Sequence, residues 1–327
     1  MVRLQIGYDL RRAPQSPATH TELYRAAIEQ CEWADRLGFE YVQLGEHHAS
    51  DGYLSNPITM SAAIAARTEK ILLRPVILTP LYDPVRLAEE LMTVDRISGG
   101  RVHPLLAAGY RPEEFEMFGK SLDTRVRDMT EAVELLKKAW TGEEFSHEGR
   151  RIHVTPTPHQ EPRPLIYIAG MSTGAAKRAA HIGDRFLAGE PGHWATYTAE
   201  CERIGRDPGP RDSGGPGFLH ITHDPDAAWH ELAPYLLHNA QMYEEWTKPN
   251  LGRGAAVFPH ANSVADLKKI SSYQVITPQQ CIELAQAYET KNRAVVFMPL
   301  LGGVPPKLAW ESLDLFEREV LPHLDVS

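Results

Sequence analysis

Short apolar runs rich in β-branched residues alternate with longer segments of helical periodicity from one end of the chain to the other. Such an alternation predicts repeated βα units around a parallel sheet. Eight candidate strands favour a closed barrel over an open sheet. The predicted strands are Leu4–Tyr8, Tyr41–Leu44, Leu72–Leu78, Val102–Ala107, Leu165–Ala169, Arg185–Ala188, Phe218–Thr222 and Ala294–Met298.

The segments between these strands carry recognisable helix signals. The first one follows a capping-box pattern, Thr19 to Glu22, and ends before Gly38, a residue type that tolerates the left-handed conformation of a helix stop. Two others open with proline, the favoured first helical residue. The predicted helices are Thr21–Leu37, Pro57–Thr68, Pro84–Ile97, Arg125–Trp140 and Asp226–Glu245.

Two stretches, 144–164 and 246–273, interrupt the alternation and are predicted to be insertions. Loops this long in a compact fold often form lids or substrate walls, so we expect the second to close over the site. Within the third strand, Pro75 after Arg74 removes a ladder donor and predicts a bulge or a cis peptide bond. The expected fold is α/β: one (β/α)8 TIM barrel with insertions, a single domain over residues 1–327.

Composition narrows the function classes. Hydrophobic residues make up 43% of the 327 residues, enough for a large core, and the net charge of −9 argues against nucleic-acid binding. The sequence contains no apolar run of about 18 residues, and its start lacks the apolar core of a signal peptide. Cys31, Cys201 and Cys281 are far apart without CxxC spacing, which predicts reduced thiols, no disulfide, and a reducing cytoplasm.

The segment 38–48, GFEYVQLGEHH, places a histidine where a barrel holds its reactive groups. Because side chains alternate along a strand, Val42 and Leu44 face the helices and His47 projects inward at the carboxyl end of the second strand. Glu46 and His48 then share the opposite face, which argues against a metal site. Histidines held by loop hydrogen bonds are the alternative reading of an adjacent pair.

Two further strand ends carry small residues. Ala107, Ala108 and Gly109 would let a flat ligand lie against the backbone, although a close helix–strand contact needs the same residues. The run from Gly170 to Gly174 is a strand end, a short Gly/Ser/Thr loop and a helix start, where free N–H groups can receive a phosphate. A plain helix cap at Ser172 is the alternative.

Taken in order, four stretches resemble the bacterial luciferase-like flavin-dependent monooxygenase family over nearly the whole chain. They are GFEYVQLGEHH, AAIAARTEKILLRPVILTPLYDPVRLAEELMTVDRISGGRV, AAGYRPEEFEMFG and EAVELLKKAWTGEEFSHEGR. The resemblance implies an α/β barrel that binds flavin at the carboxyl ends of its strands, with His47 as the catalytic residue near the reactive edge of the ring. It also implies a set of cofactor-binding residues: Val76, Ala107 and Ala108 at the strand ends, Arg125 on the phosphate side, and Gly170, Met171, Ser172, Thr173 and Gly174 at the phosphate.

Two positions depart from the family pattern. Ala108 stands where the family often has a phosphate-binding arginine, and Gly174 stands where it usually has serine. A lost charged hydrogen bond costs about 1.5–3 kcal/mol, or about one to two decades of affinity. Weak flavin binding would suit an enzyme that takes reduced FMN from a separate flavin reductase, and equally a protein that has lost catalysis.

The resemblance therefore predicts a monooxygenase that uses reduced FMN as co-substrate with O2 to oxidise a small organic substrate. The histidine side chain has a pKa of about 6.5 in model peptides, so His47 could exchange a proton with the substrate or the reacting oxygen. The alternatives are a deazaflavin-dependent dehydrogenase and a non-catalytic luciferase-like subunit. The helices at 61–67 and 84–97 match the surfaces through which family members pair, so a homodimer is expected, although small residues on a helix also suit packing within one chain.

Overall fold

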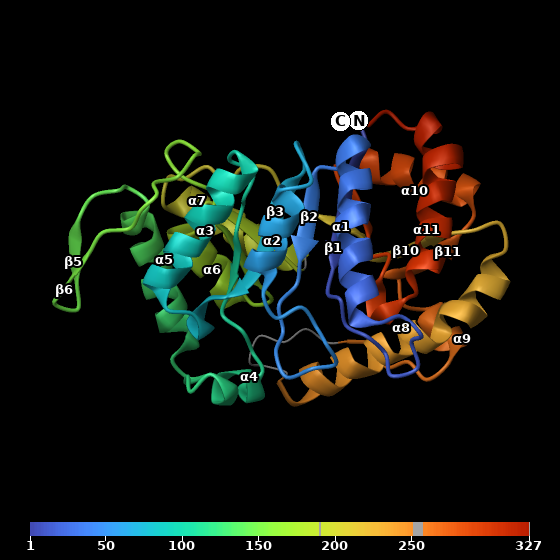
Figure 1. The fold of residues 1–327 in the computed structure, drawn as a ribbon, viewed down its shortest axis with the longest axis horizontal. Coiled ribbons are helices and arrows are strands. Elements are labelled where there is room, and N and C mark those ends of the chain that lie inside the picture. The colour runs from blue at the N-terminus through green and yellow to red at the C-terminus, as the bar shows by residue number, and fades with distance from the viewer. Residues whose placement is uncertain (190, 251–257, 327) are drawn as a thin grey trace. The chain divides into compact units, whose positions relative to one another are not determined.

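The structure is a computed structural model that describes residues 1–189, 191–250 and 258–326 (Figure 1). The described residues form two compact units. The first contains residues 1–55, 213–250 and 258–326, and the second contains residues 56–189 and 191–212. The expected single domain over residues 1–327 and the closed barrel stay predictions.

The first unit is built on four parallel strands in the order β2 (Tyr41–Leu44), β1 (Arg3–Tyr8), β12 (Ala294–Phe297) and β9 (Gly214–Pro216). Apolar side chains of these strands, such as Leu4, Ile6 and Val42, are fully buried, as expected for a parallel sheet covered by helices. A second small sheet pairs β10 (Phe218–Ile221) with β11 (Tyr273–Ile276). The helices of the unit are α1 (His20–Arg36), α8 (Pro225–Thr247), α9 (Val264–Leu267), α10 (Pro278–Glu289) and α11 (Pro306–Leu315), with short 3-10 or π segments at Lys248–Asn250, Leu301–Gly303, Phe316–Val320 and Leu321–His323.

The second unit repeats this construction. Its parallel strands run β8 (Arg185–Ala188), β7 (Tyr167–Gly170), β4 (Leu105–Ala107) and β3 (Leu72–Leu78). The insertion at 144–164 contains a two-stranded antiparallel hairpin, β5 (Phe145–His147) and β6 (Arg150–Ile152), which extends away from α5 in Figure 1. The helices are α2 (Pro57–Ala65), α3 (Pro84–Ser98), α4 (Pro112–Met117), α5 (Arg125–Ala139), α6 (Thr173–Ile182) and α7 (Pro191–Arg203), with a 3-10 turn at Thr79–Leu81.

Most element predictions are confirmed within two or three residues, and the helix signals act as expected. The Thr19 side chain accepts from the Glu22 backbone while the Glu22 carboxylate accepts from the Thr19 backbone, and Gly38 has φ of 78°. Asp83 caps α3 through the N–H groups of Val85 and Arg86. These local contacts fix where each helix begins and ends, because they satisfy N–H groups that no helical carbonyl can reach.

The predicted strand Phe218–Thr222 exists, but its predicted position in the main parallel sheet is wrong. It forms β10, which pairs with β11, whereas the strand beside β12 is Gly214–Pro216. Glycine and proline are depleted in strands, so this segment carries no local signal. It is a strand because its backbone pairs with β12, and a Cβ at Gly214 would lie 2.5 Å from a methyl of Val296.

Two details of the second unit also differ from expectation. The predicted strand Val102–Ala107 is shorter: only Leu105–Ala107 is a strand, and Val102 makes an isolated bridge to Leu73. Pro104 cannot donate a ladder hydrogen bond, which explains the break. The Arg74–Pro75 bond is not among the cis peptide bonds of the described residues, so the cis alternative is wrong, while the bulge stays a prediction. Arg74 instead places a buried charge in β3, paired with Asp212 at 2.5 Å.

The described helices include none that is both long and apolar enough to cross a membrane. The three cysteines are buried free thiols.

Candidate functional site

The segment after β2 holds His47 at the carboxyl edge of the first unit's sheet. The Gly45 N–H donates to the carbonyl of Tyr8 at the end of β1, at 2.9 Å, which continues the strand pairing past Leu44. His47 N–H then donates to the carbonyl of Leu54 at 3.3 Å, and Leu54 N–H donates to the carbonyl of Asp9 at 2.7 Å. The chain segments that follow β1 and β2 therefore lie side by side, as the prediction of a site at the strand ends requires.

The His47 imidazole is buried among aromatic rings. Its centroid lies 4.9 Å from the Tyr53 ring, edge to face, and 5.1 Å from the Trp246 ring of α8. Glu46 and His48 contact each other instead, with His48 Nε2 at 3.2 Å from Glu46 Oε1. The structure thus places Glu46 and His48 together, as the strand alternation predicts. Within the described ranges, no group of three or more His, Cys, Asp or Glu residues could hold a metal ion.

Sequence reasoning missed a buried ion pair next to His47. Asp9 and Arg11 follow β1, and Arg11 Nη2 lies 3.3 Å from Asp9 Oδ2. Burial raises the pKa of the Asp9 carboxyl, and the neighbouring Arg11 guanidinium opposes this shift. Two charged residues two positions apart, directly after the first strand, were the available signal, because charges at strand ends of such folds tend to be functional.

Three aromatic side chains surround Arg11, and we call Tyr53, Tyr243 and Trp246 the aromatic cage. The guanidinium carbon lies 4.6 Å from the Tyr243 ring centroid, 5.0 Å from that of Trp246 and 5.4 Å from that of Tyr53. The Tyr53 and Tyr243 hydroxyls are 3.2 Å apart. Since His47 touches two of the three rings, the cage links the imidazole to the buried arginine.

The predicted cofactor-binding residues all belong to the second unit. Val76 lies in β3, where it pairs with Leu105 of β4, and Ala107 pairs with Leu78. Ala107 also packs on the buried cluster of Leu78, Leu81 and Phe115. Val76, Ala107 and Ala108 are all half-buried, so these small side chains leave backbone near the surface of the unit at the strand ends.

The segment Gly170–Gly174 runs from the end of β7 into α6. Ser172 is the N-cap, and its Oγ accepts from Ala175 N–H at 3.2 Å, so the alternative reading of Ser172 as a helix cap is confirmed. A Cβ at Gly170 would lie 2.3 Å from the Ala175 Cβ, which makes glycine necessary for the close packing of strand on helix. Thr173 and Gly174 are exposed, and at Gly174 a Cβ would meet only Ser172 Oγ, at 4.0 Å.

A second arginine joins Arg125 near this helix. Arg178, on α6, is half-buried, and its Nε is fully buried without a hydrogen-bond partner among the described residues. Burial and the positive charge of Arg125 lower the pKa of Arg178. Two neighbouring guanidinium groups repel each other unless an anion lies between them. Arg178 was missed because the sequence shows only a charge on a helix face, whereas the effect of Arg125, on α5, arises from the fold.

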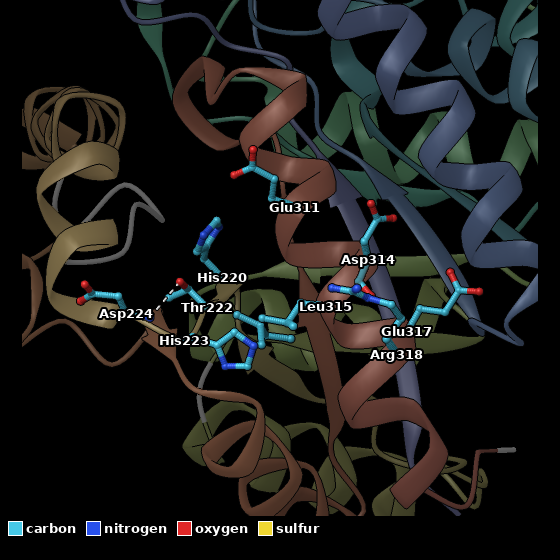
Figure 2. Close-up of a pocket in the computed structure, with 10 residues that line it drawn as sticks. His220, Thr222, His223, Asp224, Glu311, Asp314, Leu315, Glu317 and Arg318 are labelled. Atoms are coloured by element: carbon cyan, nitrogen blue, oxygen red, sulfur yellow. Dashed lines mark hydrogen bonds between the residues drawn. The ribbon is translucent and has the colours of Figure 1, made fainter.

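A pocket of about 710 Å³ lies elsewhere in the first unit, where β10 leads into α8 and faces α11 (Figure 2). His220 lies between Asp224 and Glu311 in this view, and the pocket lining contains none of the predicted site residues. It is therefore not the predicted flavin site. Burial lowers the pKa of His220 to about 4, so its imidazole is neutral at neutral pH.

This histidine makes the stability of the protein depend on pH. An unfolded histidine takes up a proton below about pH 6.5, whereas folded His220 resists it down to about pH 4. The free energy of unfolding should therefore be full above pH 6.5 and fall as the pH is lowered towards 4. In His220→Gln, urea unfolding should show a loss between pH 7 and 4.5 that is smaller by about 2 kcal/mol. Burial also lowers the pKa of His103 to about 4, so His103 contributes the same loss of stability to the wild type and to the variant. An unchanged loss in the variant would contradict this assignment.

The chain is similar to flavin-dependent monooxygenases and to deazaflavin-dependent dehydrogenases. The family model described as luciferase-like monooxygenase matches residues 8–291. The FMNH(2)-dependent dimethylsulfone monooxygenase of Pseudomonas putida is 32% identical over 166 residues, 47% of this chain and 46% of that protein. The F420-dependent glucose-6-phosphate dehydrogenase of Segniliparus rotundus is 26% identical over 326 residues, 92% and 94% of the two chains. For several curated relatives the matched region spans about half of the relative's length.

Solved structures agree in fold. The oxygenating constituent of 3,6-diketocamphane monooxygenase from Pseudomonas putida, a type II Baeyer-Villiger monooxygenase solved in complex with FMN, superposes with a TM-score of 0.75. The likeness covers 100% of both chains at 17% sequence identity, so it shows the fold alone. With the family model matched over most of its length, the chain belongs to the luciferase-like monooxygenase family.

Proposed function

We propose that this protein is a flavin-dependent monooxygenase that uses reduced FMN and O2 to oxidise a small organic substrate. The observation that carries the proposal is the pair of Arg178 and Arg125 in the second unit, because Arg178 holds a buried N–H without a partner beside a second positive charge. A phosphate monoester such as that of FMN satisfies both charges with charge-assisted hydrogen bonds. FMN-dependent relatives support this choice of ligand.

The residues present fit the phosphate end of FMN. Besides the two arginines, the N-terminus of α6 offers backbone N–H groups and the positive end of the helix dipole at Thr173 and Gly174. Because Ser172 Oγ already accepts from Ala175 N–H, we assign Ser172 to shaping the turn. Met171 belongs to the same turn. Val76, Ala107 and Ala108 would let a flat ring lie against the strand ends, and Gly170 keeps α6 close to β7.

When bound, reduced FMN would supply two electrons that, together with O2, place one oxygen atom in the substrate and the other in water. The protein's own contribution is orientation, exclusion of water and one proton. We assign the proton to His47, whose buried ring is held between Tyr53 and Trp246. Its role is to hydrogen-bond the reacting oxygen atoms and return a proton to them.

Replacing Gly174 with serine is expected to increase the affinity for reduced FMN. A Cβ there would meet only Ser172 Oγ, at 4.0 Å, so Gly174→Ser restores the serine usual in the family at a position with room for the Cβ. One charged hydrogen bond to the phosphate should tighten reduced-FMN binding by about tenfold. Anaerobic fluorescence titration measures this, with Gly174→Ala as the control that adds the Cβ without the hydroxyl. Equal affinities of the two variants would remove Gly174 from the phosphate site.

A hydride-transferring deazaflavin dehydrogenase is the second candidate, because the F420-dependent relative matches over 92% of the chain. Rapid mixing separates the two. Protein loaded anaerobically with reduced FMN is mixed with oxygenated buffer, and the return of oxidised-FMN absorbance is followed. A monooxygenase should change the time course relative to free reduced FMN at the same concentration. An identical time course at saturating protein would contradict the proposal and favour the dehydrogenase.

Three expectations remain as proposals: supply of reduced FMN by a separate flavin reductase, a homodimer, and a place in the cytoplasm. The dimer would use α2 and α3, where Ile97 is a large exposed hydrophobic residue. Light scattering after gel filtration tests the dimer, and Ile97→Glu should weaken it.

A further inference from the structure

Arg11 is a fully buried arginine whose hydrogen-bonding capacity is only partly used. Its side chain is 0% exposed. Nη2 pairs with Asp9, but neither Nε nor Nη1 has a hydrogen-bond partner among the described residues. A guanidinium group carries five N–H donors in a fixed fork, and buried arginines normally satisfy them.

The contrast with Arg101, in the second unit, shows what a structural arginine looks like in this protein. Arg101 is also buried, and it donates to four backbone carbonyls and to the hydroxyl of Thr68. Arg11 has instead one carboxylate, an interaction with the Tyr243 hydroxyl and the rings of the aromatic cage, and its Nε and Nη1 stay without a partner. Ring faces attract a cation, but they replace only part of a hydrogen bond to oxygen. Each buried donor without an acceptor destabilises the fold, because its lost hydration is not replaced.

The unpartnered N–H groups of Arg11 lie close to His47. Arg11 and His47 both contact Tyr53 and Trp246, so the unused donors lie one ring away from the proposed catalytic imidazole. Buried polar groups without partners cluster at functional sites, where a ligand supplies the missing atoms. The missing atoms here are acceptors, and the walls around them are aromatic.

We propose that Arg11 binds an oxygen anion of the substrate, a carboxylate carried on a flat or aromatic body. The carboxylate accepts from Nε and Nη1 in the two-pronged geometry that arginine favours, and the flat body packs against the aromatic cage. Since these donors are inaccessible here, the ring of Trp246 or Tyr243 turns aside when the ligand enters. This inference rests on the proposed function only in calling the ligand the substrate, and its test needs no flavin.

The test uses benzoate as the probe, with benzamide as its neutral match and benzylammonium as its cationic one. Binding to the flavin-free protein is measured by calorimetry and by tryptophan fluorescence, and Trp246→Phe identifies the reporting ring. We expect benzoate to bind at least tenfold more tightly than benzamide and benzylammonium not to bind. Arg11→Gln should lose at least tenfold in benzoate affinity, and Arg11→Lys should keep part of it.

Removing Arg11 also leaves Asp9 as a buried unpaired charge, which destabilises the fold. The double variant Arg11→Gln/Asp9→Asn avoids that charge, and circular dichroism checks its fold. Equal binding of benzoate and benzamide, full benzoate affinity in a folded Arg11 variant, or no benzoate binding to the wild type would each overturn the proposal. Because flavin is absent from the assay, failure here leaves the flavin proposal to its own test.

Discussion

Replacing Arg178 with alanine is expected to raise the dissociation constant for reduced FMN by about one to two decades, while that for reduced riboflavin changes little. The reason is that riboflavin lacks the phosphate, and Arg178 is proposed to act on the phosphate alone. Anaerobic fluorescence titration of both ligands measures the effect. Arg178→Lys keeps the charge but not the planar guanidinium group, so its dissociation constant for reduced FMN should lie between those of the wild type and Arg178→Ala.

The same variant has a second expected result that a purely structural arginine would not give. Burial and, after it, the positive charge of Arg125 lower the pKa of Arg178, so without ligand the two guanidinium groups repel each other. Arg178→Ala should therefore not lower the free energy of unfolding of the flavin-free protein, and an increase would fit the relief of repulsion. If the variant instead weakens FMN and riboflavin equally, or unfolds more easily, Arg178 supports the helix and does not bind phosphate.

The second large effect is expected at His47. In His47→Ala the reaction of the protein-bound reduced FMN with O2 should lose its protein-specific time course, and product formation should fall by about two to four decades once a substrate is known. Reduced-FMN affinity should stay within a few fold, because the phosphate contacts are proposed on other residues. The measurement is rapid mixing with oxygen at saturating protein.

A matched variant separates proton transfer from packing at this position. His47→Phe keeps a ring against Tyr53 and Trp246, so it should fold like the wild type while lacking the imidazole. If His47 acts by proton transfer, His47→Phe should behave like His47→Ala in the oxygen reaction. A phenylalanine variant with wild-type behaviour would show that the ring only fills space.

Local signals in the sequence were sufficient for most of the fold. The strand Tyr41–Leu44 and the helix starts at Pro57 and Pro84 are where periodicity and proline place them, because those choices depend on neighbouring residues. The strand Gly214–Pro216 was not predictable in the same way. Glycine and proline carry no strand signal, and only pairing with β12 selects that segment.

The residues of the candidate site also fall into two groups, those predictable from local sequence patterns and those that depend on tertiary contacts. His47 and the Gly170–Gly174 turn were found because strand alternation and a glycine-rich helix start are local patterns. Arg11 and Arg178 were missed because their significance comes from neighbours distant in sequence: Tyr243 and Trp246 around Arg11, and Arg125 beside Arg178. A charge without its environment looks like any surface charge, so such residues become visible only when the fold brings their partners together.

The most direct test of the central claim is an anaerobic titration of the wild-type protein with reduced FMN, with oxidised FMN and with a reduced deazaflavin cofactor as comparisons. We expect the wild type to bind one reduced FMN per chain saturably, and Arg178→Ala to bind it more weakly by tenfold or more. Binding of the deazaflavin cofactor without binding of reduced FMN would contradict the account in favour of the dehydrogenase. Binding of none of them would contradict it in favour of a protein without flavin chemistry.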